Sequence, residues 1–301
     1  MAAHQHGHGH DHRRASTRAL LAVLALTTAY TLVEIAGGLL TDSLALLADA
    51  GHMLSDNLSI LLAVGAIWLA RRPSTPRRSF GYRRAEILAA FVNGLALVLV
   101  GVWIVIEAVR RLDDPPDVLG GWMLLVALGG LAVNLAAAWI LQRSGRETLN
   151  VEAAFRHVIA DLLGSVGVIV AALLVLLTGW EAADPVVSLA IAALIAWSAW
   201  GVLRDSTSIL MEASPSGIDA LAVERSIAQM PGVTNVHDLH VWTITSGFDA
   251  LSAHVLVSRG DDCHARRREI EGMLAREFGI EHTTLQVDHA ADELLAVERL
   301  R

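Results

Sequence analysis

Two histidine and aspartate pairs lie in stretches that are otherwise strongly apolar. Among the thirteen histidines, only His52 and His157 are followed four residues later by an aspartate, Asp56 and Asp161 respectively. Four residues make about one helical turn, so each pair would present its side chains on one face of a helix. Two imidazole nitrogens and two carboxylates brought together form a tetrahedral set that suits zinc, with cobalt and cadmium as further candidates. The alternative is that these groups only join helices through hydrogen bonds.

Asp49 precedes His52 by three residues and lies on roughly the same helical face. We expect its carboxylate to orient His52 as an outer acceptor rather than to bind metal itself. An aspartate at the centre of a membrane helix costs about 2.5–3.5 kcal/mol, so such groups indicate an ion path. Metal ligands must be deprotonated, and binding of zinc would therefore release protons from the histidines and carboxylates.

Membrane-spanning helices are the elements that must position these side chains. The chain of 301 residues is 54% hydrophobic and only 18% charged, with a mean hydropathy of +0.50. A hydrocarbon core about 30 Å thick takes roughly 20 helical residues. Six stretches are long enough, at about Ala19–Leu40, Leu44–Ala70, Glu86–Val109, Leu119–Leu141, Val151–Leu177 and Asp184–Leu203. The fold class is thus an α-helical membrane protein, with a membrane domain at residues 18–204.

The distribution of arginine predicts how the spans are oriented. Arginines gather before the first span, between the second and third, and between the fourth and fifth, whereas the alternate loops carry only Arg110 and Arg111. Cytoplasmic flanks carry the excess of basic residues. We therefore expect a multi-pass protein of the inner (plasma) membrane with both termini in the cytoplasm.

Residues 205–301 read as a small α/β domain. An amphipathic helix at Ser216–Met230 is followed by strands at Val233–Thr245 and Ala250–Val257, a helix at Asp262–Phe278 and a strand at His282–His289. The predicted order is αββαβ. The formal net charge of −8 belongs to this domain, since the preceding residues sum to zero.

Several classes of function are excluded or disfavoured by composition. No nucleotide-binding Walker motif and no nucleophile with an adjacent base is present, so neither ATP-driven transport nor an enzyme is indicated. An acidic domain disfavours nucleic acid. The expected partners are divalent metal ions, protons and membrane lipids, with no cofactor. Residues 1–17 form a cytoplasmic tail in which alternate positions are histidine, at His4, His6, His8, His10 and His12, and the tail either gathers metal loosely or has no effect on transport.

Four segments of the chain resemble the cation diffusion facilitators, and among them the bacterial zinc exporters. The resemblance rests on GGLLTDSLALLADAGHMLSD (37–56), FGYRRAEILAA (80–90), HVIADLLGSVG (157–167) and HDLHVWTITSG (237–247). It implies a homodimer of six-span protomers, zinc efflux coupled to inward protons, and a ferredoxin-like or metallochaperone-like cytoplasmic domain. Carried over to this sequence, the transport site falls on His52, Asp56, His157 and Asp161.

The same resemblance implies a regulatory zinc site in the cytoplasmic domain, at His237, His254, His264 and Asp288. The alternative is that these are ordinary surface residues of an acidic domain. Some relatives carry a further metal site in the loop between the second and third spans, but residues 71–84 contain no histidine, so we expect that site to be absent. Two rival functions stay open: a transporter of this fold for cobalt, cadmium, nickel, iron or manganese, and a membrane-bound metal sensor that does not translocate.

Overall fold

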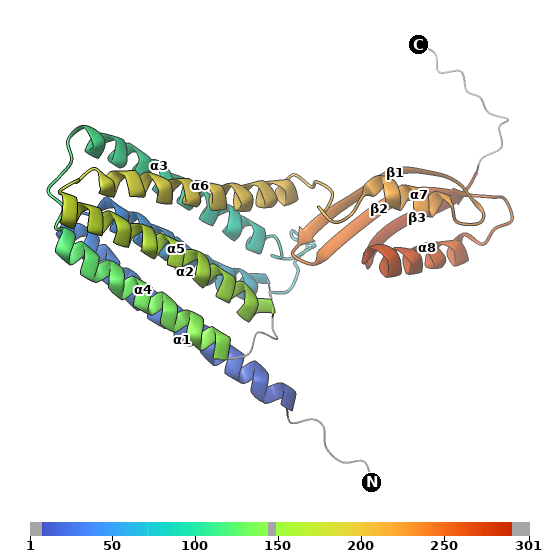
Figure 1. The fold of residues 1–301 in the computed structure, drawn as a ribbon. Coiled ribbons are helices and arrows are strands. Elements are labelled where there is room, and N and C mark those ends of the chain that lie inside the picture. Colours follow the sequence, from blue (N-terminus) through green and yellow to red (C-terminus); the bar gives the residue numbers. More distant parts are fainter. Residues whose placement is uncertain (1–7, 71, 144–148, 291–301) are drawn as a thin grey trace, which may run out of the picture. The chain divides into compact units, whose positions relative to one another are not determined.

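The computed structural model describes residues 8–70, 72–143 and 149–290 (Figure 1). Within them, six helices are long and apolar enough to cross a membrane, which confirms the predicted spans. These helices are α1 (His8–Thr41), α2 (Leu44–Ala70), α3 (Ala85–Asp113), α4 (Gly120–Arg143), α5 (Leu149–Thr178) and α6 (Ala183–Leu210).

Helices α1 and α6 extend farthest beyond the predicted spans. Helix α1 begins at His8, although its apolar part begins at Ala19 as expected. Helix α6 continues to Leu210, past the predicted domain boundary at residue 204. Helical hydrogen bonding does not stop where the hydropathy falls, so a hydropathy profile locates a span better than it locates the ends of the helix. The first part of the histidine-rich tail, residues 1–7, lies outside the described residues.

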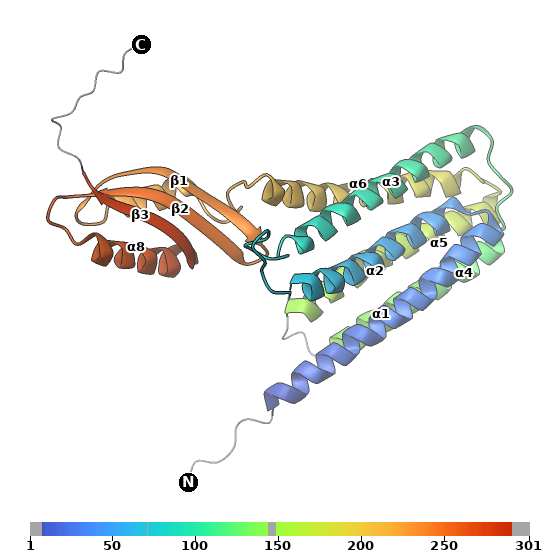
Figure 2. The same ribbon diagram turned by 180° about the vertical axis from the view of Figure 1, so that it is seen from behind.

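The chain forms two compact units. The first comprises Met1–Leu62 and Val92–Val202, and the second comprises Ala63–Phe91 and Leu203–Arg301. In the first unit, α1 runs beside α4, and α4 packs against α5 (Figures 1 and 2). Its core combines large side chains such as Leu97, Ile104 and Met123 with alanines of α2 and α5. Large apolar side chains on the outside stay exposed, up to 84% for Trp197, as a lipid-facing surface requires.

The start of α2 is fixed by a carboxylate from α6. Asp184 is fully buried, and its side chain accepts hydrogen bonds from the Ser43 hydroxyl at 2.6 Å and from the amides of Leu44 at 2.8 Å and Ala45 at 3.1 Å. These amides belong to the first turn of a helix, where no helical acceptor exists for them. A negative side chain at this end also complements the helix dipole. Asp184 therefore anchors the helix that carries His52.

The second unit contains a three-stranded sheet with the order β1-β2-β3, formed by β1 (Val233–Thr245), β2 (Phe248–Val257) and β3 (His282–His289). Strands β1 and β2 are antiparallel and joined by a tight turn at Gly247, whose φ of 71° favours glycine. Strands β2 and β3 are parallel, so helix α8 (Cys263–Phe278) makes the crossover between them. With α7 (Ala220–Ala228), the order αββαβ is confirmed.

Helices α7 and α8 share one core with the sheet. Val223 and Ile227 of α7 and Ile270 and Leu274 of α8 are fully buried in the same cluster as inward-facing strand residues such as Val255. Each of the two helices begins at an aspartate cap, Asp219 and Asp262.

Capping of α8 also lowers the pKa of the Asp262 carboxyl. Hydrogen bonds from the amides of Ala265, at 3.1 Å, and His264, at 2.9 Å, hold the pKa of the exposed Asp262 carboxyl below its usual range. The charged form of Asp262 therefore favours the folded start of α8.

Candidate metal site

Helices α2 and α5 bring the two predicted pairs together in the first unit. His52 Nε2 lies 3.5 Å from Asp56 Oδ2 on its own helix and 3.8 Å from Asp161 Oδ1 on α5. His157 Nε2 lies 3.2 Å from Asp56 Oδ2 and 3.7 Å from Asp161 Oδ2. The two imidazole ring centroids are 6.1 Å apart. We call these four residues the α2–α5 site.

The spacing of the donor atoms fits a tetrahedral ion. Zinc ligands lie about 2.0–2.2 Å from the metal, so neighbouring donors around a tetrahedron stand about 3.3–3.6 Å apart. The four nitrogen to oxygen distances of the α2–α5 site range from 3.2 to 3.8 Å. The donor atoms of His52, Asp56 and Asp161 all lie within 4.8 Å of one another. His157 is not part of this closer set, although its Nε2 lies 3.2 and 3.7 Å from the two carboxylates.

Unsatisfied atoms in the site bear on the hydrogen-bonding alternative. In the part of the chain that the structure describes, Asp161 Oδ1 and His52 Nδ1 are buried without a hydrogen-bond partner. A buried carboxylate is costly unless hydrogen bonds or a cation compensate for its lost solvation. Side chains that served only to join two helices would be expected to satisfy these atoms with hydrogen bonds. The geometry therefore favours a cation-binding site.

Asp49 does not make the contact predicted for it. Among the described residues no hydrogen bond links it to His52, whose Nδ1 has no partner. Instead Asp49, only 4% exposed, points at α5, where a Cβ on Gly164 would come within 2.8 Å of Asp49 Oδ1. An offset of three residues turns a side chain about 60° around the helix from its neighbour, enough to aim Asp49 past His52. Its orienting role stays a prediction with no contact behind it.

A further acid, Glu34 of α1, is buried in the same unit. Glu34 is 1% exposed, and a Cβ on Gly130 would come within 2.8 Å of its Oε1. Glycines at 130 and 164 thus make room for carboxylates between the helices. Together with Asp49 and Asp161, Glu34 gives the helical bundle an acidic interior.

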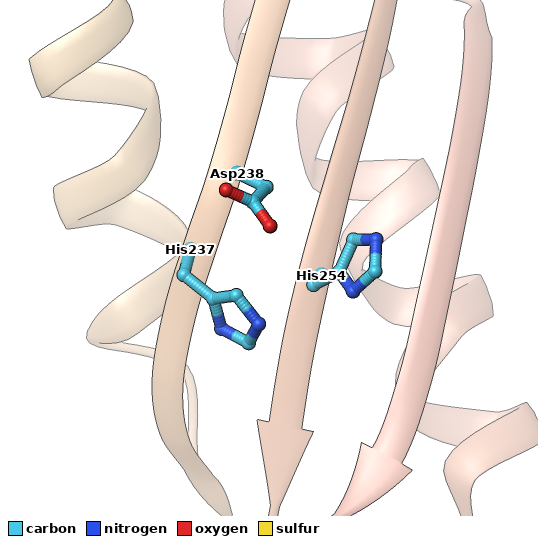
Figure 3. A group of neighbouring side chains, drawn as sticks. All are labelled: His237, Asp238 and His254. Atoms are coloured by element: carbon cyan, nitrogen blue, oxygen red, sulfur yellow. The ribbon is translucent and has the colours of Figure 1, made fainter. Parts of the chain in front are cut away.

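The second group of metal-ligand types lies on the sheet of the second unit. His237 of β1 and His254 of β2 are directly opposite in the strand register, with ring centroids 5.3 Å apart. Asp238 completes the group, and the three donor atoms lie within 4.8 Å of one another (Figure 3). His237 and Asp238 are exposed, and His254 is half-buried. We call them the cytoplasmic group.

Asp238 could not have been found by strand periodicity. Successive strand residues point to opposite faces, so an aspartate next to His237 should point away from it. The register shifts between His237 and His240, and Asp238 adopts a φ of 50° there. This bulge turns the carboxylate to the side of the sheet that carries the histidines. A strained, non-glycine residue beside two histidines is typical of functional sites.

The predicted cytoplasmic set of His237, His254, His264 and Asp288 is not brought together as a whole. Only His237 and His254 belong to the group. The residue opposite His254 on β3 is Gln286, whereas Asp288 lies two positions farther along, opposite Leu256. Gln286 Nε2 donates to Asp288 Oδ2 at 2.8 Å. His264 lies in the first turn of α8, at the Asp262 cap. Among the described residues, Asp238 is the third member of the group.

Sequence reasoning also missed Asp184, which it treated only as the boundary of a span. Its partners Ser43, Leu44 and Ala45 lie about 140 positions away in the chain. The available indication was an aspartate at the very start of an apolar stretch, but nothing local shows which helix end it caps.

Two family models cover most of the chain. Residues 20–211 match the cation efflux transmembrane domain, and residues 215–290 match the cytoplasmic domain of cation efflux proteins. A cadmium, cobalt and zinc/H(+)-K(+) antiporter of Bacillus subtilis is 44% identical over 92% of this chain and 90% of its own length. The zinc transporter ZitB of Escherichia coli is 42% identical, over 95% and 93% respectively.

A third relative and the protein of a solved structure are both named CzcD. The metal cation efflux system protein CzcD of Cupriavidus metallidurans is 40% identical over 95% of this chain and 91% of its own length. The structure of the metal-bound C-terminal domain of a CzcD transporter from that genus is 38% identical; the match covers 23% of this chain and 97% of that one, with a TM-score of 0.23.

Proposed function

Because the chain belongs to the cation efflux family, we propose that it exports zinc from the cytoplasm in exchange for protons, through the α2–α5 site. Membership itself makes it a multi-pass cation transporter of the inner membrane and not an enzyme. The observation that carries the proposal is the convergence of two imidazoles and two carboxylates, from helices that are far apart in sequence, at separations of 3.2 to 3.8 Å.

The chemistry of the donors supports zinc as the cargo. Two nitrogens and two oxygens in tetrahedral array suit zinc, whereas calcium and magnesium take six or more oxygens. The relatives are named for zinc, or for cadmium, cobalt and zinc together. Cobalt and cadmium are therefore the competitors to test, by measuring whether each lowers the flux of zinc when added in excess.

Proton exchange follows from the requirement that the ligands be deprotonated. Zinc entering the site displaces the protons held by its histidines and carboxylates, and protons arriving from the other side favour release of the metal. Asp161 is 6% exposed, and its Oδ1 has no hydrogen-bond partner. Leaving such a carboxylate both charged and empty in a bilayer is costly. The return step of the empty transporter is therefore favoured when protons replace zinc.

The proposal also covers the orientation of the protein in the membrane and its oligomeric state. Both termini face the cytoplasm, supported by the excess of arginine in the flanks and loops on that side. The protein acts as a homodimer, which the matched cytoplasmic-domain model suggests. Chemical cross-linking of the intact membrane would test the dimer, and accessibility of a cysteine placed in residues 1–7 would test the orientation.

We assign a regulatory metal to the cytoplasmic group. Two imidazoles and one carboxylate give three ligands and leave a fourth position open. Asp238 is the carboxylate that lies beside the two histidines in the described residues, and His264 and Asp288 stay predicted ligands. A cavity of about 330 Å³ lined by Asp238, His254 and Gln286 gives access to the group. Zinc bound there would bias the transporter only if its affinity differs between two conformations.

Flux measurements on the full chain test the proposal. Proteoliposomes with an imposed pH gradient and a trapped fluorescent zinc reporter should take up zinc, and an ionophore that collapses the gradient should stop the uptake. Asp161→Asn should lose transport, whereas the matched charge change Asp42→Asn, at an exposed turn, should keep it. Zinc that binds without crossing the membrane would instead identify a sensor, and flux that ignores the gradient would refute proton exchange.

A further inference from the structure

A large cleft in the second unit has no part in the proposed transport. Its volume is about 840 Å³, and one side is formed by residues 77–81 and Arg84, between α2 and α3. The other side comes from β1, at Leu239–Trp242, and from Ser252 of β2. All of these residues belong to the same compact unit. Small-molecule sites measure about 300–1,000 Å³, so the cleft is large enough for an organic ligand.

The cleft is lined by more positive than negative charge. Arg77, Arg78 and Arg84 face it, against a single lining carboxylate, Glu212. Glu212 is already engaged, since its Oε1 accepts a hydrogen bond from Arg84 Nη2 at 2.8 Å. Among the described residues, neither Arg77 nor Arg78 forms an ion pair with a carboxylate. A cluster of this kind repels zinc, so the cleft does not serve the cargo.

Arg78 is held in place while its hydrogen-bonding edge stays free. Its guanidinium lies over the ring of Tyr82, 4.2 Å from the centroid. Stacking of this kind restrains a guanidinium but uses none of its N–H donors. Hydroxyls of Ser79, Ser214 and Ser252 add further donors around the cleft. Guanidinium groups, which can donate two parallel N–H bonds, and hydroxyls are groups that recognise phosphate oxygens.

We propose that this cleft binds a phosphorylated anion, with Arg77 and Arg78 as the main contacts. The oxygens of one phosphate group would accept from both guanidinium groups, and the organic body would lie against the apolar faces of Phe80 and Trp242. Arg84 is followed directly by Ala85, where the membrane-spanning helix α3 begins. Because the loop runs directly into this span, we place its basic residues near the lipid headgroups, where basic pockets take up anionic phospholipids. This inference does not depend on the identity of the transported metal.

The test compares two double variants that remove the same charge from the same loop. Arg77→Gln/Arg78→Gln removes the cleft contacts. Arg72→Gln/Arg83→Gln is the matched control, because these arginines stack on Trp68 and Phe248, each 4.5 Å from the ring centroid, and do not line the cleft. Native mass spectrometry on the full chain in an uncharged detergent measures binding of dioctanoyl phosphatidylglycerol, dioctanoyl phosphatidylcholine and ATP.

We expect phosphatidylglycerol to bind more tightly than phosphatidylcholine, and the cleft double variant to bind it about 30-fold more weakly, since each basic contact to an anionic lipid contributes about fivefold. The control variant should keep wild-type binding. The same pattern with ATP in place of the lipid would also support the site, with a soluble ligand as its source. The proposal is overturned if neither anion binds better than phosphatidylcholine, or if both double variants weaken binding equally.

Discussion

Removal of the Asp184 carboxylate should loosen the start of α2. In Asp184→Ala, the Ser43 hydroxyl and the amides of Leu44 and Ala45 lose the acceptor that they share at 2.6, 2.8 and 3.1 Å. Each buried donor left without a partner costs about 1–3 kcal/mol. The hydroxyl can turn to another acceptor, but the two amides cannot. We therefore expect the free energy of opening this turn to fall by about 3 kcal/mol.

Hydrogen exchange followed by mass spectrometry measures this effect directly. A loss of about 3 kcal/mol corresponds to exchange about 150-fold faster at the first amides of α2. Asp184→Asn keeps one acceptor oxygen and should show an intermediate increase, of about tenfold. Asp42→Asn is the control, because the Asp42 side chain is 60% exposed in its pair with Arg111, and such surface pairs contribute little. Exchange in Asp184→Ala that matches wild type would refute the anchoring role.

Three further predictions concern α5 and the second unit. Gly164→Ala should lower thermal stability and zinc flux, because the added Cβ would lie 2.8 Å from Asp49 Oδ1. Gly167→Ala is the control and should leave both unchanged, because its added Cβ would lie 3.5 Å from its nearest neighbour. Asp262→Ala should speed amide exchange at the start of α8 at neutral pH, and Asp262→Asn should not, because asparagine also caps helices. Asp238→Ala should weaken binding of a second zinc per chain at least tenfold by calorimetry.

The sign of the pH dependence at α8 follows from the lowered pKa of Asp262. A carboxyl whose pKa is lower in the folded state adds stability above its unfolded pKa, near 4, and loses it as the pH falls through the folded value. The difference between wild type and Asp262→Ala should therefore be full at pH 7 and be lost as the pH falls through the lowered pKa of Asp262 in the folded state. A difference that persists in acid would contradict the capping account. Unchanged stability and flux in Gly164→Ala would contradict the close packing of Asp49 against Gly164.

Residue spacing along the chain predicted the features that depend only on neighbouring residues, namely the helix faces and the strands. The spacing of His52 and Asp56, and of His157 and Asp161, places each pair on one helix face whatever the tertiary structure is. The strands were placed closely because alternation and the turn at Gly247 are local properties. The packing of α2 against α5 is a tertiary contact that no local pattern encodes. It was expected only because charged side chains are costly in a bilayer and therefore tend to face one another inside the bundle.

The missed features all depend on contacts that no local pattern encodes. Asp184 caps a helix about 140 residues away. Asp238 joins the histidines only because a bulge breaks the alternation that the prediction relied on. Asp49 lies close to Gly164 of α5, an approach that no spacing within α2 indicates.

Zinc K-edge X-ray absorption tests the central claim most directly. The sample is the full chain with residues 2–12 deleted and with His237→Ala/His254→Ala, loaded with one zinc per protomer. The α2–α5 site predicts two imidazole nitrogens and two carboxylate oxygens at about 2.0–2.2 Å. Adding His157→Ala should remove one imidazole from that shell. A six-oxygen shell, or a spectrum that His157→Ala leaves unchanged, would contradict the assignment of zinc to this site.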